Sequence, residues 1–473
     1  MRVTKNVLLT GLAYVATTVV GFVGTWYFAR ELGPGPLGTF ALGVSLVRWA
    51  ITADFGVGIA TIKRISESDE ESAYMSASTV IHFLLGGLVL VLFTVFSREV
   101  NEYIGVEAVG YVMAIYAFAM LHSNLASGFN GTKRVHVKNW FDVVERVMRV
   151  GTQAGLVALG LGVTALYTGY TVSIILVTIG MAVYLYLRTN LSPVRPSWEH
   201  FRRLFDFAKF SWLGRVKSQS ISWMDIFVLG FFVQPSQVGI YQVAWTVTRT
   251  FELLSTAISA NVFPEISDLS SANDLARIRT LISEGFVYAG VIPIPGIVGA
   301  ALVGQQVLQV YGEEFTAGYS VLVVLGVLAF VRSYERHVTA VIDSLDYPER
   351  TFRINTVFVV TNTAANIVLI WQYGAIGAAI ASVIAMSVSF LYSWWVLNGI
   401  LDTRLPYREI GHQAVAAVVM GASVQLVDRA NVVSGFYGLL LTVFLGGVVY
   451  FVVLLTISVP VRKKAASVIG VDL

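Results

Sequence analysis

The sequence predicts an all-α, polytopic membrane protein of about fourteen transmembrane helices, with two six-helix lobes related by an internal repeat and two appended C-terminal helices. The first observation is composition: among 473 residues, 56% are hydrophobic and only 13% are charged, and the mean hydropathy is +0.72. A soluble domain carries about a quarter charged residues. The second observation is a series of long apolar runs, and the third is a stretch that returns in the second half of the chain.

The apolar runs are each long enough to cross a bilayer core of about 30 Å. They lie at residues 7–29, 38–62, 73–96, 103–127, 139–162, 165–187, 209–233, 238–262, 285–310, 318–342, 352–373, 375–398, 411–427 and 433–459. The first run lacks a small-residue cleavage site, so we expect it to remain a membrane span.

The repeat joins the second and eighth runs. LGPGPLGTFALGVSLVRW (32–49) aligns without a gap to VQPSQVGIYQVAWTVTRT (233–250). Pro34 falls over Pro235, and Arg48 falls over Arg249. These identities coincide with the turn that opens each run and with a basic residue deep inside it. They predict an internal duplication.

The connecting segments predict the topology. Most of the 32 basic residues fall in alternate connections, which places both termini in the cytoplasm and the chain in the cell membrane. We expect lobes at 1–187 and 209–398, an appended pair of helices with a cytoplasmic tail at 399–473, and a cytoplasmic linker at 188–208. The linker is amphipathic: its second half belongs to WEHFRRLFDFAKF (198–210), whose apolar spacing predicts a helix on the inner membrane surface.

Basic residues inside the runs predict a site for an anionic substrate. Arg48, Arg215 and Lys217 have no acidic residue within one turn of their own helices. An unpaired cation in the membrane is costly and therefore suggests function, and the guanidinium fork suits phosphate. The predicted substrate-binding residues are Arg48, Arg249, Arg215, Lys217 and Arg332. The alternative is an ion pair between helices, for example between Asp54 and Arg215.

Other charges in the runs have nearby partners in the sequence. Helical spacing predicts the local pairs Asp142–Arg146, Glu145–Arg149, Arg249–Glu252 and Arg332–Glu335. Asp54 and Asp225 have two interpretations. Each either binds a coupling cation or proton, as intramembrane carboxylates do in pumps, or forms a salt bridge to one of the arginines.

Several classes of function have no support in the sequence. Cysteine is absent, which excludes disulfides and thiol chemistry and leaves the compartment open on redox grounds. His82 and His122 lie in separate apolar runs, so no metal site is expected. The chain contains no phosphate-binding glycine loop followed by Lys-Ser/Thr and no His-Glu-x-x-His sequence. We therefore expect a transporter without a cofactor, and not an enzyme.

Several segments resemble one known family. FARELGPGPLGTFAL, DFGVGIATIKRISE, WMDIFVLGFFVQPSQVGIYQVA, NVFPEIS and YGAIGAAIAS are similar to the polysaccharide-transport family. That family belongs to the multidrug/oligosaccharidyl-lipid/polysaccharide exporter superfamily. The resemblance covers essentially the whole chain and implies two six-helix lobes around a central cavity. It implies a flippase that moves a polyprenyl-phosphate-linked sugar to the outer leaflet, with Arg48 and Arg249 on the helices that bind the lipid phosphate in relatives.

The resemblance leaves the substrate and the exact function open. The carrier would be dolichyl-linked in an archaeon, with the glycan used for surface glycoproteins such as an S-layer, or undecaprenyl-linked in a bacterium. Glycosyltransferases are the expected protein partners. The alternatives are a drug or cation antiporter of the same superfamily, or a membrane partner or enzyme of a glycan-assembly complex. An antiporter would need unpaired carboxylates, whereas the unpaired groups here are mostly basic.

Overall fold

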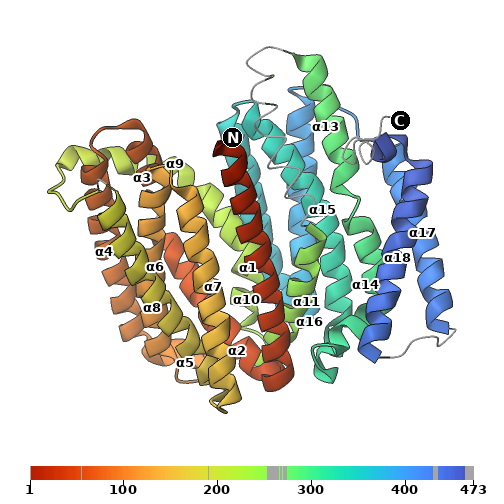
Figure 1. The fold of residues 1–473 in the computed structure, drawn as a ribbon, viewed down its shortest axis with the longest axis horizontal. Helices are drawn as coiled ribbons and strands as arrows, with labels where there is room; N and C mark the ends of the chain where they lie inside the picture. The colour runs from red at the N-terminus through yellow and green to blue at the C-terminus, as the bar shows by residue number, and fades with distance from the viewer. Residues whose placement is uncertain are drawn as a thin grey trace. The chain divides into compact units, whose positions relative to one another are not determined.

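The computed structural model describes residues 2–54, 56–189, 191–252, 266, 269, 274–429 and 435–463. Every predicted apolar run overlaps a helix within these residues, and no strand occurs among them. The all-α prediction is therefore confirmed. Two compact units, Met1–Gly239 and Ile240–Leu473, divide the chain, and their helices are labelled in Figure 1. The lobe boundaries expected from the repeat remain a prediction.

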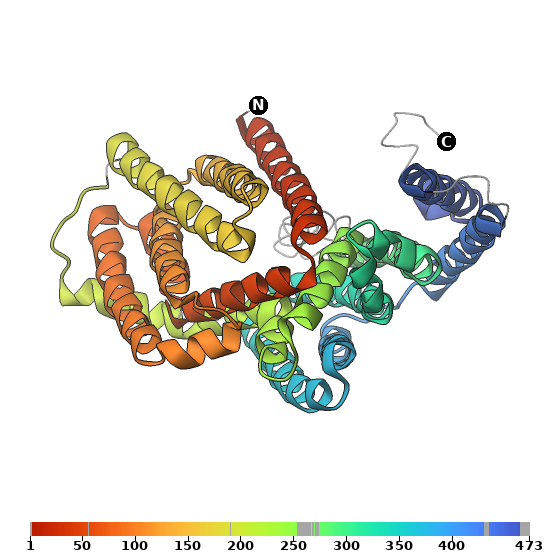
Figure 2. The same ribbon diagram turned by 90° about the horizontal axis from the view of Figure 1, so that it is seen from below.

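The first unit consists of long helices joined by short breaks. Its elements are α1 (Arg2–Leu32), α2 (Pro34–Ile51), the 3₁₀ turn η1 (Thr52–Asp54), α3 (Val57–Glu67), α4 (Glu71–Val95), α5 (Ser97–Ile104), α6 (Val109–Gly131), α7 (Val135–Ala158), α8 (Gly162–Arg188), α9 (Trp198–Gln219), the π-helical segment η2 (Ser220–Met224) and α10 (Asp225–Leu229). Within the unit, α8 packs against both α6 and α7, and α1 packs against α7 (Figure 2).

The second unit begins within α11 (Pro235–Thr248), which is followed by the 3₁₀ turn η3 (Arg249–Glu252). The remaining elements are α13 (Leu275–Ala289), α14 (Pro293–Gln309), η4 (Glu313–Gly318), α15 (Tyr319–Ser344), α16 (Pro348–Asn398), α17 (Tyr407–Arg429) and α18 (Gly435–Ile457). Helices α15 and α16 pack together, as do α17 and α18.

Eight helices in the described residues are long and apolar enough to cross a membrane. One of them, α16, covers two predicted runs, because Gly374 adopts a φ of 60° and breaks the helix between 352–373 and 375–398. A left-handed backbone conformation is readily adopted by glycine and rarely by other residues. These helices confirm a polytopic membrane protein. The total of fourteen spans remains a prediction.

The predicted amphipathic helix is the first part of α9. Leu204 and Ala208 are buried in a core cluster with residues of α3 and α4, while Arg202 and Lys209 are exposed on the opposite side. Ser197 precedes the helix and forms a capping box with His200. This cap satisfies backbone groups that a helix start leaves unpaired.

The turns that open α2 and α11 meet inside the first unit. Both helices begin with a proline, which is pre-organised for a first helical position. A Cβ on Gly38 would overlap the backbone oxygen of Pro235, and a Cβ on Gly239 would overlap the backbone oxygen of Pro34. The two repeat-related glycines therefore allow a reciprocal contact that any side chain would block.

We predict that Gly38→Ala destabilises the protein. The added methyl group overlaps backbone atoms, which cannot move aside as a flexible side chain does, so the expected loss is roughly 1–3 kcal/mol. Thermal unfolding of the purified protein in detergent measures the effect. Gly35→Ala is the matched control: it lies on the same helix, a Cβ there meets no atom within 4 Å, and alanine favours helix. A Gly38→Ala protein as stable as Gly35→Ala would contradict the proposed contact.

Candidate functional site

Arg48 lies in the last turn of α2, and its side chain is half-buried within the first unit. Its Nη2 donates a hydrogen bond to the hydroxyl of Tyr170 on α8 at 3.4 Å. The guanidinium carbon lies 6.0 Å from the ring centroid of Trp223 in the π-helical segment η2. Within the described part of the chain, Nε is buried without a hydrogen-bond partner, and no carboxylate forms an ion pair with Arg48. Its charge is therefore compensated only by neutral aromatic groups.

Two further arginines of α7 lie close to Arg48. The guanidinium of Arg149 packs over the ring of Tyr170 at 4.4 Å, so this tyrosine contacts two arginines, one through its ring and one through its hydroxyl. Arg149 also forms an ion pair with Glu145, with 3.3 Å between Nε and Oε1. The predicted Glu145–Arg149 pair is thus confirmed. The charges of Arg149 and Arg48 both act on Arg146, one helical turn before Arg149.

The predicted Asp142–Arg146 pair is wrong. The carboxylate of Asp142 instead accepts from Lys138 at 2.6 Å and lies 3.4 Å from His122. The guanidinium of Arg146 packs against Gly21 of α1, where an added Cβ would lie 3.5 Å from it. Lys138 stands four residues before Asp142, so the sequence did contain this competing partner. Arg146 is consequently a cation without an ion pair in the described residues, and sequence reasoning missed it.

Arg215 is paired with Asp54, as one of the sequence alternatives proposed. Its Nη1 lies 2.5 Å from Oδ2 of Asp54, and its Nη2 lies 3.4 Å from the hydroxyl of Ser123. Asp54 is 1% exposed; its other oxygen accepts from the backbone N–H of Gly56 at 2.9 Å, and His82 lies 3.9 Å away. This carboxylate therefore joins η1 to α9.

Lys217 and Asp225, on either side of the π-helical segment, are both buried. Each has an interaction partner, so neither is an unpaired charge. The described residues contain no group of three histidine, aspartate or glutamate side chains placed to hold a metal ion.

In the second unit, Glu252 is shared by two arginines of α15. Its oxygens lie 3.1 Å from Arg332 Nη1 and 3.1 Å from Arg336 Nη2. Arg332 also lies 5.9 Å from the ring centroid of Trp245. Arg249, at the start of η3, is exposed and has no ion pair within the described ranges.

Two more predicted pairs are therefore wrong. Arg249 does not pair with Glu252, because both oxygens of this carboxylate accept from Arg332 and Arg336 of α15 instead. Arg332 does not pair with Glu335, whose Oε1 accepts a hydrogen bond from Ser389 of α16 at 3.0 Å. In both cases the glutamate interacts with a residue of another helix, and not with the arginine three residues before it in the sequence.

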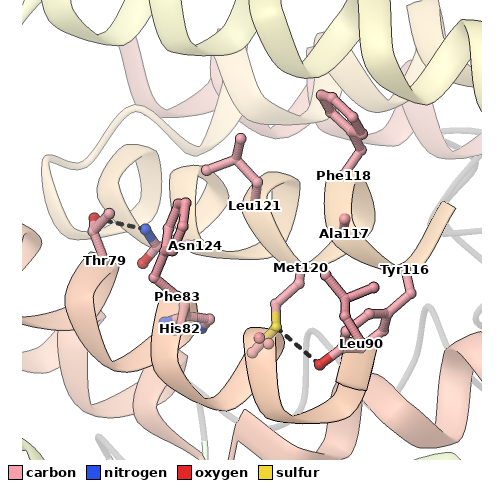
Figure 3. Close-up of a pocket in the computed structure, with 12 residues that line it drawn as sticks. Thr79, His82, Phe83, Leu90, Tyr116, Ala117, Phe118, Met120, Leu121 and Asn124 are labelled. Carbon is pink, nitrogen blue, oxygen red and sulfur yellow. Dashed lines mark hydrogen bonds between the residues drawn. The ribbon is translucent and has the colours of Figure 1, made fainter. Parts of the chain in front are cut away.

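Two cavities in the units are mainly apolar. One, of about 250 Å³, lies between α4 and α6 in the first unit (Figure 3). Most of its polar lining groups have a partner: Asn124 donates to Thr79 at 2.9 Å, and the Tyr116 hydroxyl contacts the Met120 sulfur at 3.1 Å. The other, of about 280 Å³, is lined by α14, α15, α17 and α18. Neither cavity carries the charge that an anionic group needs.

The sequence matches the family described as polysaccharide biosynthesis protein over residues 3–270, more than half of the chain. The chain belongs to this family. A probable flippase of Haloferax volcanii, AglR, is 34% identical over 469 residues, covering 98% of this chain and 97% of that protein. A probable low-salt glycan biosynthesis flippase of the same organism, Agl15, is 28% identical over 446 residues, covering 94% and 93%.

Solved structures show the same fold. The lipid II flippase MurJ in an inward closed conformation has a TM-score of 0.80 at 15% identity, covering 94% of this chain and 98% of that one. An inward-facing MATE family transporter of the MOP superfamily has a TM-score of 0.65 at 14% identity, covering 81% and 95%. The family resemblance and the polytopic fold expected from the sequence are both confirmed.

We predict that Asp54→Asn strongly destabilises the protein, because it leaves the partly buried Arg215 without its partner. Breaking a fully buried pair costs roughly 3–5 kcal/mol, and we expect a loss up to that size. Asp206→Asn is the control. Asp206 pairs with Lys209 on the exposed side of α9, where an ion pair contributes about 0–1 kcal/mol. Unfolding in detergent compares the two variants.

The double variant Asp54→Asn with Arg215→Gln completes the cycle. It should recover part of the lost stability, since neither charge then lacks its partner. Strictly additive losses would show that Arg215 and Asp54 do not act as a pair.

Proposed function

We propose that this protein is a flippase that moves a polyprenyl-phosphate-linked sugar or oligosaccharide from the cytoplasmic to the outer leaflet. The observation that carries the proposal is the cluster around Arg48. Two half-buried arginines, Arg48 and Arg146, lie there without forming an ion pair in the described residues, since the nearby Glu145 is bound to Arg149. A phosphate ester is an anion that offers several acceptor oxygens, and it matches the guanidinium fork. Relatives named as flippases over nearly the full length support the same reading.

The arginines predicted to bind the substrate have different roles in this proposal. Arg48 binds the phosphate from the first unit, and Arg146 adds a second donor beside it. Arg249, the repeat-related residue, has an exposed guanidinium and is a second candidate ligand for the phosphate. Arg215 is neutralised by Asp54, whereas Arg332 shares Glu252 with Arg336, so that group keeps a net positive charge that would attract an anionic substrate.

Transport would proceed by alternating access of the two repeat-related lobes. The phosphate and the sugar, which are strongly hydrated, would pass along the polar path, while the polyprenyl chain stays in hydrocarbon. The apolar cavity between α14, α15, α17 and α18 fits such a chain, because glycines of α14 and α18 line it and leave room against the helix backbones. Asp54 and Asp225 are the groups through which a proton or cation would couple, and both are buried.

The glycan would serve cell-surface polymers or glycoproteins such as an S-layer, with glycosyltransferases as partners. The carrier would be dolichyl-linked if the host is an archaeon and undecaprenyl-linked if it is a bacterium. A drug antiporter is disfavoured, because the described unpaired charges in the runs are basic whereas cation export requires available carboxylates.

We predict that Arg48→Ala abolishes or severely reduces translocation at near-normal membrane abundance. A charge-assisted hydrogen bond to phosphate contributes about 1.5–3 kcal/mol, or roughly 10- to 150-fold in affinity. Arg48→Lys should restore only part of the activity, since an ammonium lacks the planar fork. The measurement is the leaflet distribution of lipid-linked sugar, together with abundance, in cells that depend on each variant.

Variants of other arginines separate the loss of a phosphate ligand from the loss of a structural ion pair. Arg146→Ala should resemble Arg48→Ala, whereas Arg149→Ala should lower abundance because it leaves Glu145 unpaired. Arg98→Ala is the neutral control, since Arg98 is an exposed residue paired with Glu102. Normal translocation by a well-expressed Arg48→Ala protein would exclude the phosphate role. A normal leaflet distribution in cells without this protein would exclude the flippase itself.

The proposed orientation has both termini in the cytoplasm, and the absence of cysteine gives it a clean test. Ser192 and Glu107 are both exposed. Ser192 lies between α8 and α9, and Glu107 lies between α5 and α6 at the outer end of the fourth apolar run, so the two are expected on opposite sides of the membrane. In intact cells, an impermeant thiol reagent should label Glu107→Cys and should label Ser192→Cys only after the membrane is opened. The reverse pattern would invert the topology.

A further inference from the structure

A basic and aromatic pocket lies where the two ends of α16 come together in the second unit. Its volume is about 580 Å³. Arg350 and Arg353 line it from the start of the helix, while Tyr392 and Trp395 line it from the end, followed by Asn398 and Gly399. The bend at Gly374 makes this possible, because it reverses the chain and returns the end of α16 to its beginning. None of these residues belongs to the proposed substrate site.

Aromatic residues indicate the depth of this pocket in a membrane. Trp371 and Tyr373 are largely exposed beside the bend of α16, and Trp395 is 70% exposed near the other end. Tyr373 and Trp395 are about 22 residues apart, which is ~33 Å of helix at ~1.5 Å per residue. Tryptophan and tyrosine gather at both membrane–water interfaces, which are separated by a core of about 30 Å. The pocket therefore lies at the level of the lipid headgroups.

The two arginines lack acidic partners among the residues that the structure describes. Neither Arg350 nor Arg353 forms an ion pair there. The guanidinium of Arg350 lies 4.5 Å from the ring centroid of Tyr347, a neutral partner. Asn398 is occupied by hydrogen bonds to Thr403. Two positive charges, three residues apart on one helix, thus face a pocket that contains no negative group.

An apolar stripe leads away from the pocket along the second half of α16. Trp395, Leu391, Val388 and Ile384 follow one another at intervals of four, three and four residues, which places them on one helix face. All four side chains are exposed. The rings of Tyr392 and Trp395 stack at 5.9 Å with planes 19° apart, which presents a flat surface at the head of the stripe.

We propose that this pocket binds an anionic phospholipid of the surrounding bilayer. The phosphate accepts hydrogen bonds from Arg350 and Arg353, and a hydrocarbon chain lies along Leu391, Val388 and Ile384. The contact between the phosphate and the two arginines is supported by charge complementarity, since basic pockets at the headgroup level bind anionic lipids. The contact with a hydrocarbon chain is supported by the exposure of the apolar stripe. This exposure also favours a lipid of the surrounding bilayer over the transported polyprenyl lipid.

The test is native mass spectrometry of the full-length protein titrated with phosphatidylglycerol or with phosphatidylcholine. The wild-type protein should retain one phosphatidylglycerol molecule in preference to phosphatidylcholine. Arg350→Gln with Arg353→Gln should weaken that binding by at least about tenfold for each arginine, the value of one charge-assisted hydrogen bond. Arg277→Gln with Arg279→Gln is the matched control, because these two arginines of α13 are exposed and their loss changes the net charge equally.

Three results would overturn the proposed phosphate contact with Arg350 and Arg353. One is equal loss of phosphatidylglycerol from both double variants, which would indicate a general charge effect. Another is equal binding of the two lipids by the wild-type protein. The third is stoichiometric polyprenyl phosphate in this pocket, lost in Arg350→Gln with Arg353→Gln, with no retention of phosphatidylglycerol.

Trp395→Ala tests the contact between the hydrocarbon chain and the apolar stripe. This variant leaves both arginines and should lower the affinity for both lipids. An unchanged affinity would contradict the contact with the stripe. The experiments on the arginine double variants and on Trp395→Ala both measure lipid binding. Their outcome does not depend on whether the protein translocates a lipid-linked sugar.

Discussion

The free energy of holding a guanidinium away from water constrains both units of this protein. A charged group inside an apolar bundle requires a partner, and the described residues supply one in three different ways. Asp54 binds Arg215 across two helices, Glu145 binds Arg149 along one helix, and Glu252 binds two arginines of α15 at once. Against this pattern, Arg48 stands out because aromatic groups are its only described partners. Such an arrangement is stable when an anion completes it, which is why the cluster suggests a substrate site.

Departures from α-helical geometry accompany these charges. Helix α2 gives way to a 3₁₀ turn that ends at Asp54, and α11 gives way to one that runs from Arg249 to Glu252. The π-helical segment Ser220–Met224 separates buried Lys217 from Asp225 and carries Trp223 toward Arg48. Tight and wide helical turns change the direction in which side chains leave the axis, and π-segments are frequent at functional sites. The irregular turns therefore help to aim the charged groups that a straight helix would send elsewhere.

The sequence predicted the helices well and the ion pairs only in part. Apolar runs locate helices because the bilayer demands about 20 apolar residues for each span. Ion pairs depend on which helices become neighbours, and periodicity does not contain that information. The ion pair Glu145–Arg149 was predicted correctly from helical spacing. Glu252, in contrast, binds Arg332 on another helix and does not pair with Arg249 three residues before it. Arg146 was missed for a local reason: Lys138 competes for Asp142 from the preceding turn. A carboxylate with bases on both sides cannot be assigned from spacing alone.

Depth separates the arginines of this protein into two chemical classes. Arg350 and Arg353 lie at the headgroup level beside exposed aromatic rings, where water remains within reach and an unpaired charge costs little. The features that indicate a ligand there are the pocket between the ends of α16 and the exposed apolar stripe. Arg48 lies about ten residues inside its apolar run, so the same lack of a partner is far more costly there. An arginine without an ion pair is thus consistent with a lipid contact at Arg350 and Arg353 and with a transported phosphate at Arg48. The two sites differ in the distance of the guanidinium from water.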